Sequence, residues 1–278
     1  MLALATRGAA HLGAAAERVR RFVRGRPGNA APDLYYTMFG IDCRLALGEP
    51  PGAADAAGLR AFGDGSELDT VHLACLARCW SRCPDGVPES VRGRVRQRAA
   101  ACRAPDGGYR LTAAAQRSSI YGGFLLVSAL QDAGLAVPGM PDLLAAVEAA
   151  RVGDGGYADE PGRTAAAMNA TVGAVLLHRA AGVAAPERAM EWIRSRHRPG
   201  GGFAATPAAP LPDLVSTATA LTAWKAAGAD FAPLRAECLD FVEGLWDEQG
   251  GFAATPADDT PDVEYTFHAL LSFGCLMP

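Results

Sequence analysis

The sequence has no apolar run long enough to cross a membrane. Spanning the hydrocarbon core of a bilayer takes about 18–20 consecutive apolar residues, and no such run occurs in this chain of 278 residues, although half of them are hydrophobic. The N-terminal stretch MLALATRGAAHLGAAAERVRRFVRG is interrupted by Arg7 and His11, so it is a poor signal peptide and a better amphipathic helix. We therefore expect a cytoplasmic protein without a transmembrane segment.

An excess of positive charge and a metal-binding cysteine pair are also missing. The formal net charge is −4, which argues against nucleic acid as a partner. The seven cysteines are an odd number and include no Cys-x-x-Cys pair. Cys75, Cys79 and Cys83 recur every four residues along one helical face, and we expect buried, reduced thiols there. We accordingly predict no cofactor.

What the sequence does contain is an internal repeat. A Gly-Gly-aromatic triplet occurs at residues 107–109, 155–157, 201–203 and 250–252, and the first glycines are 48, 46 and 49 residues apart. The last two copies continue as GGFAATPAAPLPDLVSTATALTAW and GGFAATPADDTPDVEYTFHALLSF. A period near 47 residues indicates a repeat architecture.

Each repeat is expected to hold two helices, of which the second is apolar on most sides. In the last four repeats this second helix starts twelve residues after the first glycine of the triplet. The aligned starts are Asp33, Asp69, Ser119, Ala167, Asp213 and Asp262. Glycine lies fifteen residues past four of these starts, where it would end the helix. Pro32, Pro212 and Pro261 each precede an aspartate and are expected at the first helical position.

The first helices are charged and amphipathic, which is typical of an outer helix with one face in solvent. We expect them near residues 9–25, 53–62, 89–103, 141–152, 186–197 and 233–246. Six pairs predict an all-α fold, a closed α/α toroid (α6/α6 barrel) in which six inner helices lie within six outer helices. We expect residues 1–278 to form this single domain. An open solenoid is the alternative, but it needs polar capping repeats, and the chain ends in the apolar HALLSFGCLMP.

The segment from Glu191 to Arg196, the GGF turns and the sequence PDVEYTF resemble the prenyltransferase and squalene-oxidase repeat. That repeat is shared by protein prenyltransferase β subunits and squalene-hopene-type triterpene cyclases, and the resemblance covers most of the chain from Asp33 onward. It implies an α/α toroid and an isoprenoid or polyene-like substrate in a central cavity. For the β subunits it also implies a helical protein partner.

The resemblance also implies which family residues are missing here. Asp213 stands at the position of the zinc-binding Asp, but Val215 replaces the Cys and Tyr265 replaces the His. Pro210 and Pro207 stand where the family has diphosphate-binding basic residues. One oxygen ligand cannot hold zinc, so we predict no metal site and no thiol-prenylation machinery. In the partial match to the cyclase proton-donor motif, residues 66–71, a leucine stands at the donor position.

Polar side chains recur at the starts of the inner helices. Asp69 and His72 are three residues apart and share a helix face, so the aspartate could orient the histidine as a general acid–base pair. The alternative is that Asp69 caps its helix and His72 bonds a neighbouring helix. Glu264 and His268 form an i,i+4 pair with equivalent alternatives. Our catalytic candidates are Asp69, His72 and Glu264.

Aromatic residues on the inner helices could line an apolar pocket or stabilise a carbocation over their rings, although core packing would explain them equally. The predicted substrate-binding residues are Tyr36, Phe39, Tyr121, Trp224, Tyr265 and His268. Together these features predict a zinc-independent enzyme of the prenyltransferase or terpene-cyclase type. The alternatives are a non-catalytic barrel that binds a lipid or a protein, and a degenerate protein prenyltransferase that takes its metal from other residues.

Overall fold

The structure is a computed structural model that describes residues 1–25, 33–230 and 232–277. The chain divides into two compact units: unit 1 comprises Met1–Pro50 and Ile193–Pro278, and unit 2 comprises Pro51–Trp192. Within the described residues all regular elements are helices, and the only extended pairings are isolated bridges. No helix among them combines the length and the apolar character needed to cross a membrane.

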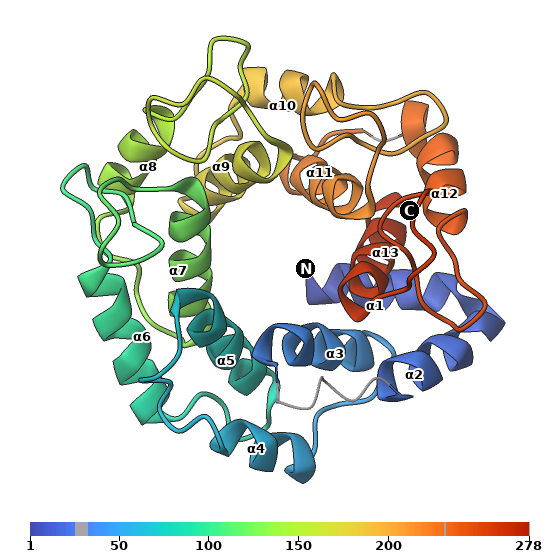
Figure 1. The fold of residues 1–278 in the computed structure, drawn as a ribbon, viewed down its shortest axis with the longest axis horizontal. Helices are drawn as coiled ribbons and strands as arrows, with labels where there is room; N and C mark the ends of the chain where they lie inside the picture. The colour runs from blue at the N-terminus through green and yellow to red at the C-terminus, as the bar shows by residue number, and fades with distance from the viewer. Residues whose placement is uncertain (26–32, 231, 278) are drawn as a thin grey trace. The chain divides into compact units, whose positions relative to one another are not determined.

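Each unit is built from helical hairpins (Figure 1). Unit 1 contains α1 (Leu2–His11), α2 (Ala16–Gly25), α3 (Leu34–Ala46), α11 (Leu214–Ala227), α12 (Arg235–Glu243) and α13 (Val263–Leu276). Unit 2 contains α4 (Ala53–Arg60), α5 (Thr70–Arg82), α6 (Glu89–Ala101), α7 (Ile120–Asp132), α8 (Met140–Glu148) and α9 (Met168–Ala180). The boundary between the units falls within α10 (Glu187–Arg194).

The predicted starts of all six inner helices are confirmed, because the six aligned residues are the N-caps of α3, α5, α7, α9, α11 and α13. Asp213 shows the cause, since its Oδ1 accepts the backbone N–H of Ser216 at 2.7 Å. The predicted terminal glycines are left-handed, as Gly134 (φ 68°) and Gly228 (φ 72°) illustrate. Pro32 lies outside the described residues, and the placement of Pro212 and Pro261 was wrong by two positions. They precede the N-cap, because the capping aspartate must itself lie outside the helix.

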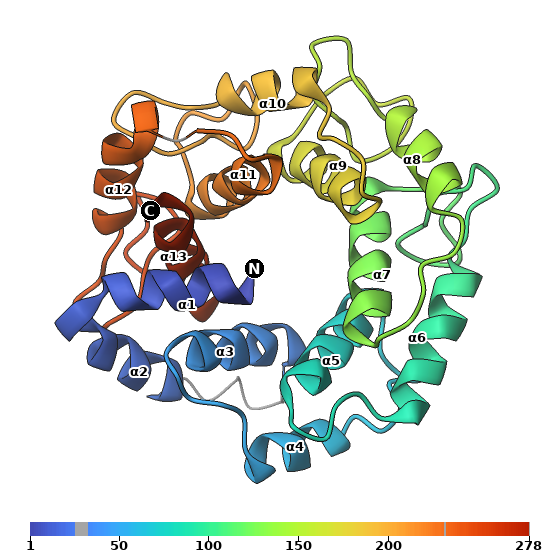
Figure 2. The same ribbon diagram turned by 180° about the vertical axis from the view of Figure 1, so that it is seen from behind.

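The prediction of one N-terminal helix over residues 9–25 was also wrong. The chain forms two helices, α1 and α2, and it turns between them at Gly13, which has a φ of +51°. Helix α1 is an additional helix that packs on α13 and α3, as Figures 1 and 2 show. The backbones of α1 and α13 touch: a Cβ on Gly8 would lie 1.8 Å from the Leu270 oxygen, and one on Gly274 would lie 1.8 Å from the Leu4 oxygen.

The Gly-Gly-aromatic turns link successive hairpins. The first glycine of each turn has a positive φ and lies against the outer helix of the following hairpin, where a Cβ would clash. For example, a Cβ on Gly201 would lie 2.0 Å from the Glu237 oxygen in α12. The last turn behaves in the same way within unit 1, because a Cβ on Gly250 would lie 2.5 Å from the Arg18 oxygen in α2. The sixth hairpin therefore packs on the first, a contact that an open stack of hairpins does not make.

The aromatic residue of each turn is fully buried beneath a side chain six positions earlier. Arg103 lies over the ring of Tyr109, and Arg151 over that of Tyr157, with guanidinium-to-centroid distances of 4.8 and 5.4 Å. His197 and Trp246 cover Phe203 and Phe252 in edge-to-face geometry. All seven cysteines lie in the described residues and are buried and free of disulfides, as predicted.

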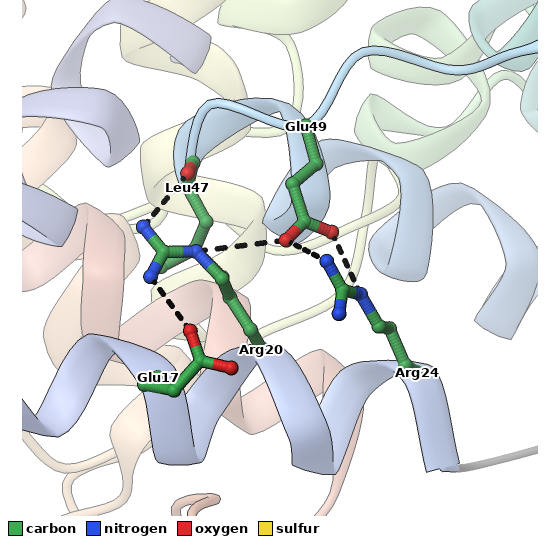
Figure 3. A network of polar contacts seen from close by, with 5 residues as sticks. All are labelled: Glu17, Arg20, Arg24, Leu47 and Glu49. Atoms are coloured by element: carbon green, nitrogen blue, oxygen red, sulfur yellow. Dashed lines mark hydrogen bonds and ion pairs between the residues drawn. The ribbon is translucent and has the colours of Figure 1, made fainter.

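Arginines of α2 hold this outer helix against the end of α3 (Figure 3). Arg20 donates to the Leu47 carbonyl oxygen at 3.2 Å and to Glu17 at 3.1 Å, and it pairs with Glu49 at 3.6 Å. Arg24 forms a two-pronged contact with both oxygens of Glu49. Because Leu47 is the C-cap of α3, the cation also meets the negative end of that helix.

Candidate functional site

The starts of α3 and α13 bring polar and aromatic side chains together in unit 1. Asp33 accepts the backbone N–H of Tyr35 at 2.8 Å, and Asp262 accepts that of Glu264 at 2.7 Å, so both helices begin with a carboxylate cap. Helix α13 packs against α3, so the side chains that follow the two caps meet. The Tyr35 hydroxyl donates to Oε1 of Glu264 at 2.6 Å. This tyrosine–glutamate pair is the centre of the candidate site.

Glu264 has the electrostatics of a proton donor. Burial raises the pKa of its carboxyl and the nearby Asp262 raises it further, while the hydrogen bond from Tyr35 opposes both without cancelling them. No side chain in the described part of the chain bonds Oε2. A carboxyl with a raised pKa keeps its proton to higher pH, which suits a general acid.

Two further tyrosines of the predicted site lie beside this pair. Tyr36 follows Tyr35 on α3, the two rings meet edge to face at 5.6 Å, and Tyr36 is 36% exposed. The pKa of Tyr265 is raised by burial and by the negative charge of Glu264 and Asp262, so its phenol stays protonated. Tyr36 contacts the ring of Tyr35, and Tyr265 follows Glu264 in the chain, so both aromatic residues are neighbours of the pair.

Phe39 and His268 pack against this tyrosine–glutamate pair and its surroundings. Phe39 is buried and packs against the rings of Tyr35 and His268, at 5.1 and 5.7 Å. Nδ1 of His268 lies 2.9 Å from the main-chain oxygen of Glu264. Because a carbonyl oxygen only accepts, Nδ1 carries the hydrogen. The local spacing had suggested a carboxylate–imidazole pair, whereas Nδ1 bonds the main-chain oxygen of Glu264 on the same helix.

Trp224 has a different environment. It is 5% exposed and meets the buried ring of Phe203 edge to face at 5.6 Å. These contacts are those of a core residue beside the turn at residues 201–203. Of the two readings that the sequence left open for this tryptophan, core packing describes its contacts.

The other candidate residues, Asp69, His72 and Tyr121, belong to unit 2. Oδ1 of Asp69 accepts the backbone N–H of His72 at 2.8 Å and also lies 2.8 Å from Nδ1 of the same ring. The aspartate thus both caps α5 and orients the imidazole. Both side chains are exposed, Asp69 by 59% and His72 by 40%. Partial burial raises the pKa of Asp69, but the hydrogen bonds from His72 outweigh this and lower it. Asp69 is therefore suited to holding His72 rather than to donating a proton.

Tyr121 lies at the start of α7 and is 41% exposed. Its backbone N–H donates to Oδ1 of Asp159 at 2.8 Å, and burial raises the pKa of that carboxyl. Asp159 was not among the predicted residues, although the repeat offered a signal. It lies four residues after the first glycine of its turn, as Ala254 does, and both backbone oxygens accept the first N–H of an inner helix, at 2.8 Å.

The residues at the family's zinc position do not fit a zinc ion. Asp213 uses Oδ1 to cap α11, Val215 carries no donor atom, and the surroundings of Tyr265 disfavour its phenolate. Across the described residues, His, Cys, Asp and Glu form no group of three or more that could hold a metal ion. A zinc site needs three or four such ligands, so the described residues at this position do not form one.

Comparison with known proteins places these observations in a fold family. Residues 157–277 match the model described as the prenyltransferase alpha-alpha toroid domain. A comparison with curated protein sequences gives no match.

Several solved structures resemble the chain along nearly its whole length. The type II terpene cyclase MstE from Scytonema aligns with a TM-score of 0.63 and 14% identity, over 96% of this chain and 97% of that one. A variant of it in complex with geranylgeranyl dihydroxybenzoate aligns with a TM-score of 0.60 and 13% identity, over 97% of each chain. Candida albicans protein geranylgeranyltransferase-I complexed with GGPP aligns with a TM-score of 0.55 and 12% identity, over 86% of this chain and 90% of that one.

These likenesses confirm the predicted fold class. The chain has the α/α toroid fold of prenyltransferases and type II terpene cyclases, and the predicted resemblance to that family is confirmed over residues 157–277. At 12–14% identity the alignments carry the fold and leave the chemistry to the residues of this chain.

Proposed function

We propose that this toroid is an enzyme of the prenyltransferase and terpene-cyclase type, which binds a long apolar isoprenoid or polyene and acts by acid–base chemistry without zinc. The observation that carries the proposal is the half-buried Glu264, whose raised pKa and hydrogen bond from Tyr35 suit a proton donor. The exposed Tyr36 and the neighbouring Tyr265 supply aromatic surface beside it. We also propose that residues 1–278 form a single domain and that the protein is cytoplasmic.

The substrate class is supported by the structural neighbours. One of them was solved with GGPP and another with geranylgeranyl dihydroxybenzoate, and both ligands carry a geranylgeranyl chain. In this chain Val215, Pro207 and Pro210 stand where the resemblance implied zinc and diphosphate ligands. A substrate activated at its alkene, rather than through zinc or a diphosphate, agrees best with that replacement.

The proposed reaction begins with proton transfer from Glu264. The O–H bond of the carboxylic acid breaks, a C–H bond forms at one alkene carbon, and the π electrons leave a cation on the other. Tyrosine ring faces stabilise such a cation. A second alkene of the same substrate attacks it, and loss of a proton to a base restores a neutral product. The product is an isomer of the substrate, so no oxidant or second reactant is required.

In unit 2, Asp69 and His72 are proposed as a general acid–base pair. The carboxylate of Asp69 holds the imidazole of His72, and the imidazole would accept the proton, because the lowered pKa of Asp69 makes that carboxylate a weak base. The substitutions Asp69→Asn and His72→Ala test this role.

The experiment is incubation with squalene, geranylgeraniol and geranylgeranyl diphosphate in H₂O and in D₂O, followed by chromatography and mass spectrometry. We expect an isomer of one substrate that gains one deuterium in D₂O. Glu264→Gln should lower its rate about 10²- to 10⁴-fold, the usual contribution of a general acid. Glu187→Gln, an exposed position of α10, is the matched control and should retain full activity.

Two outcomes would contradict these assignments. Full turnover by Glu264→Gln would remove Glu264 as the acid, and full turnover by both Asp69→Asn and His72→Ala would remove that pair. The alternative function, a barrel that binds a lipid or a protein without catalysis, is favoured by the replaced family residues Val215 and Tyr265. It predicts that a bound isoprenoid is recovered unchanged from every incubation.

A further inference from the structure

We infer that Tyr35 is a positioning residue for Glu264: its hydroxyl occupies Oε1 and thereby confines the acidic proton to Oε2. The inference deepens the proposed function and rests on it for its catalytic meaning. Its physical basis is a hydrogen bond between two side chains 229 residues apart in sequence, which only the packing of α13 against α3 brings together.

The tyrosine is held rigidly enough for this task. Its backbone N–H is fixed by Asp33 at 2.8 Å. Its ring meets Phe39 edge to face at 5.1 Å and Tyr36 at 5.6 Å, with interplanar angles of 77° and 89°. Phe39 is in turn buried against Phe267 at 5.6 Å. A ring in edge-to-face contact with two other aromatic rings has few rotamers left, so the hydroxyl stays directed at the carboxyl.

The hydrogen bond makes the two oxygens of Glu264 inequivalent. An O–H donor at 2.6 Å occupies Oε1, and a proton on that oxygen would leave Tyr35 only the weaker acceptor, a carboxyl hydroxyl, so the bond favours the proton on Oε2. The acid therefore carries its proton on Oε2, for which the described residues supply no hydrogen-bond partner. The same bond stabilises the carboxylate left after proton transfer, since hydrogen bonds to charged acceptors are the stronger ones.

Other groups around Glu264 do not duplicate this role. Asp262, the N-cap of the same helix, raises the pKa of Glu264 through its negative charge alone, and Tyr265 follows Glu264 in the chain. Helices α1, α11 and α12 also pack on α13, but none of their described titratable side chains bonds Glu264. Tyr36, on the same helix as Tyr35, makes no hydrogen bond to Glu264, so it serves as a matched control.

The test is a titration of the full-length protein labelled with ¹³C at the glutamate carboxyls, followed by NMR. The Glu264 resonance is identified by its loss in Glu264→Gln. In Tyr35→Phe we expect its titration midpoint to rise by about one pH unit, a tenfold change in proton affinity, because the opposing hydrogen bond is gone. Tyr36→Phe should leave the midpoint unchanged. An unchanged midpoint in Tyr35→Phe, or an equal shift in Tyr36→Phe, would overturn the inference.

A second measurement keeps the inference testable if Tyr35→Phe folds poorly. Replacement of Tyr35 by 3-fluorotyrosine keeps the ring and hydroxyl but strengthens the phenol as a donor, so the midpoint of Glu264 should fall. A midpoint that stays or rises would contradict the assignment. The titration needs no substrate, so it separates the two claims. The expected shifts without turnover of any polyene would leave Tyr35 as proposed and refute the proposed function. If Glu264→Gln lost turnover while Tyr35→Phe left the titration midpoint unchanged, the proposed function would stand and the role of Tyr35 would be refuted.

Discussion

The repeated turns supply a matched pair of substitutions, Tyr109→Phe and Tyr157→Phe. Both tyrosines are fully buried at equivalent positions, and both rings lie under an arginine, at 4.8 Å for Arg103 and 5.4 Å for Arg151. They differ at the hydroxyl. Tyr157 donates to Glu148, whereas the Tyr109 hydroxyl has no hydrogen-bond partner among the described residues. Each substitution removes one oxygen and leaves the ring and its arginine in place.

The expected effects have opposite signs. A hydrogen bond to a charged group contributes about 1.5–3 kcal/mol to the free energy of unfolding. Glu148 is 38% exposed and keeps Arg151 and His178 as partners, so we expect Tyr157→Phe to cost only about 1–2 kcal/mol. A buried hydroxyl without a partner itself costs about 1–3 kcal/mol. Tyr109→Phe should therefore be neutral or stabilise the protein by up to about 1 kcal/mol.

The assay is thermal unfolding followed by circular dichroism, with urea unfolding as a second measure. For chains of this size about 1 kcal/mol corresponds to roughly 2–4 °C in Tm. Tyr157→Phe should lower the Tm by roughly 2–8 °C, and Tyr109→Phe should leave it unchanged or raise it. A loss in Tyr109→Phe equal to that in Tyr157→Phe would refute the reasoning, because the hydroxyls would then contribute alike.

Two further predictions concern packing and pH. Gly250→Ala should destabilise the protein by roughly 2–6 kcal/mol. The backbone of Gly250 has a φ of 102°, which disfavours a side chain, and an added Cβ would lie 2.5 Å from the Arg18 oxygen. The control Gly93→Ala, in open space on α6, should stabilise it by up to about 1 kcal/mol in urea unfolding. The bond from Arg94 and the backbone N–H of Ser66 lower the pKa of Asp64 to about 2. The stability that Asp64 contributes should thus be lost as pH falls from 3.8 to about 2. Acid unfolding of Asp64→Asn should show less loss over that interval, and an unchanged profile would exclude this role.

The inner helices could be predicted from sequence because their signals are local. An aspartate or serine at a fixed distance after a glycine pair caps a helix wherever the helix lies, and a glycine fifteen residues later ends it. The prediction of the N-terminal helix was wrong because the signal that sets it is not local in sequence. Gly8 and Gly274 are 266 residues apart, and their role in bringing α1 against α13 exists only in the folded chain. Sequence periodicity does not register such a contact.

The candidate site was predicted in part. Glu264, Tyr36 and Tyr265 were selected because they follow helix starts. The structure puts Glu264 on the hydroxyl of Tyr35, whose ring contacts Tyr36. The partner assigned to Glu264 was its neighbour in sequence, His268, whereas the observed partner is Tyr35 on a helix at the other end of the chain. Spacing along one helix identifies which residues share a face, but not which of them faces a second helix.

Native mass spectrometry of the protein with geranylgeraniol tests the central claim most directly. The account predicts one bound isoprenoid per chain. Tyr36→Arg should weaken this binding, because it places a charge on the exposed ring position beside Glu264, while the distant surface variant Glu187→Gln should bind normally. Absence of any complex with geranylgeraniol, squalene or geranylgeranyl diphosphate, or binding that Tyr36→Arg leaves unchanged, would contradict it.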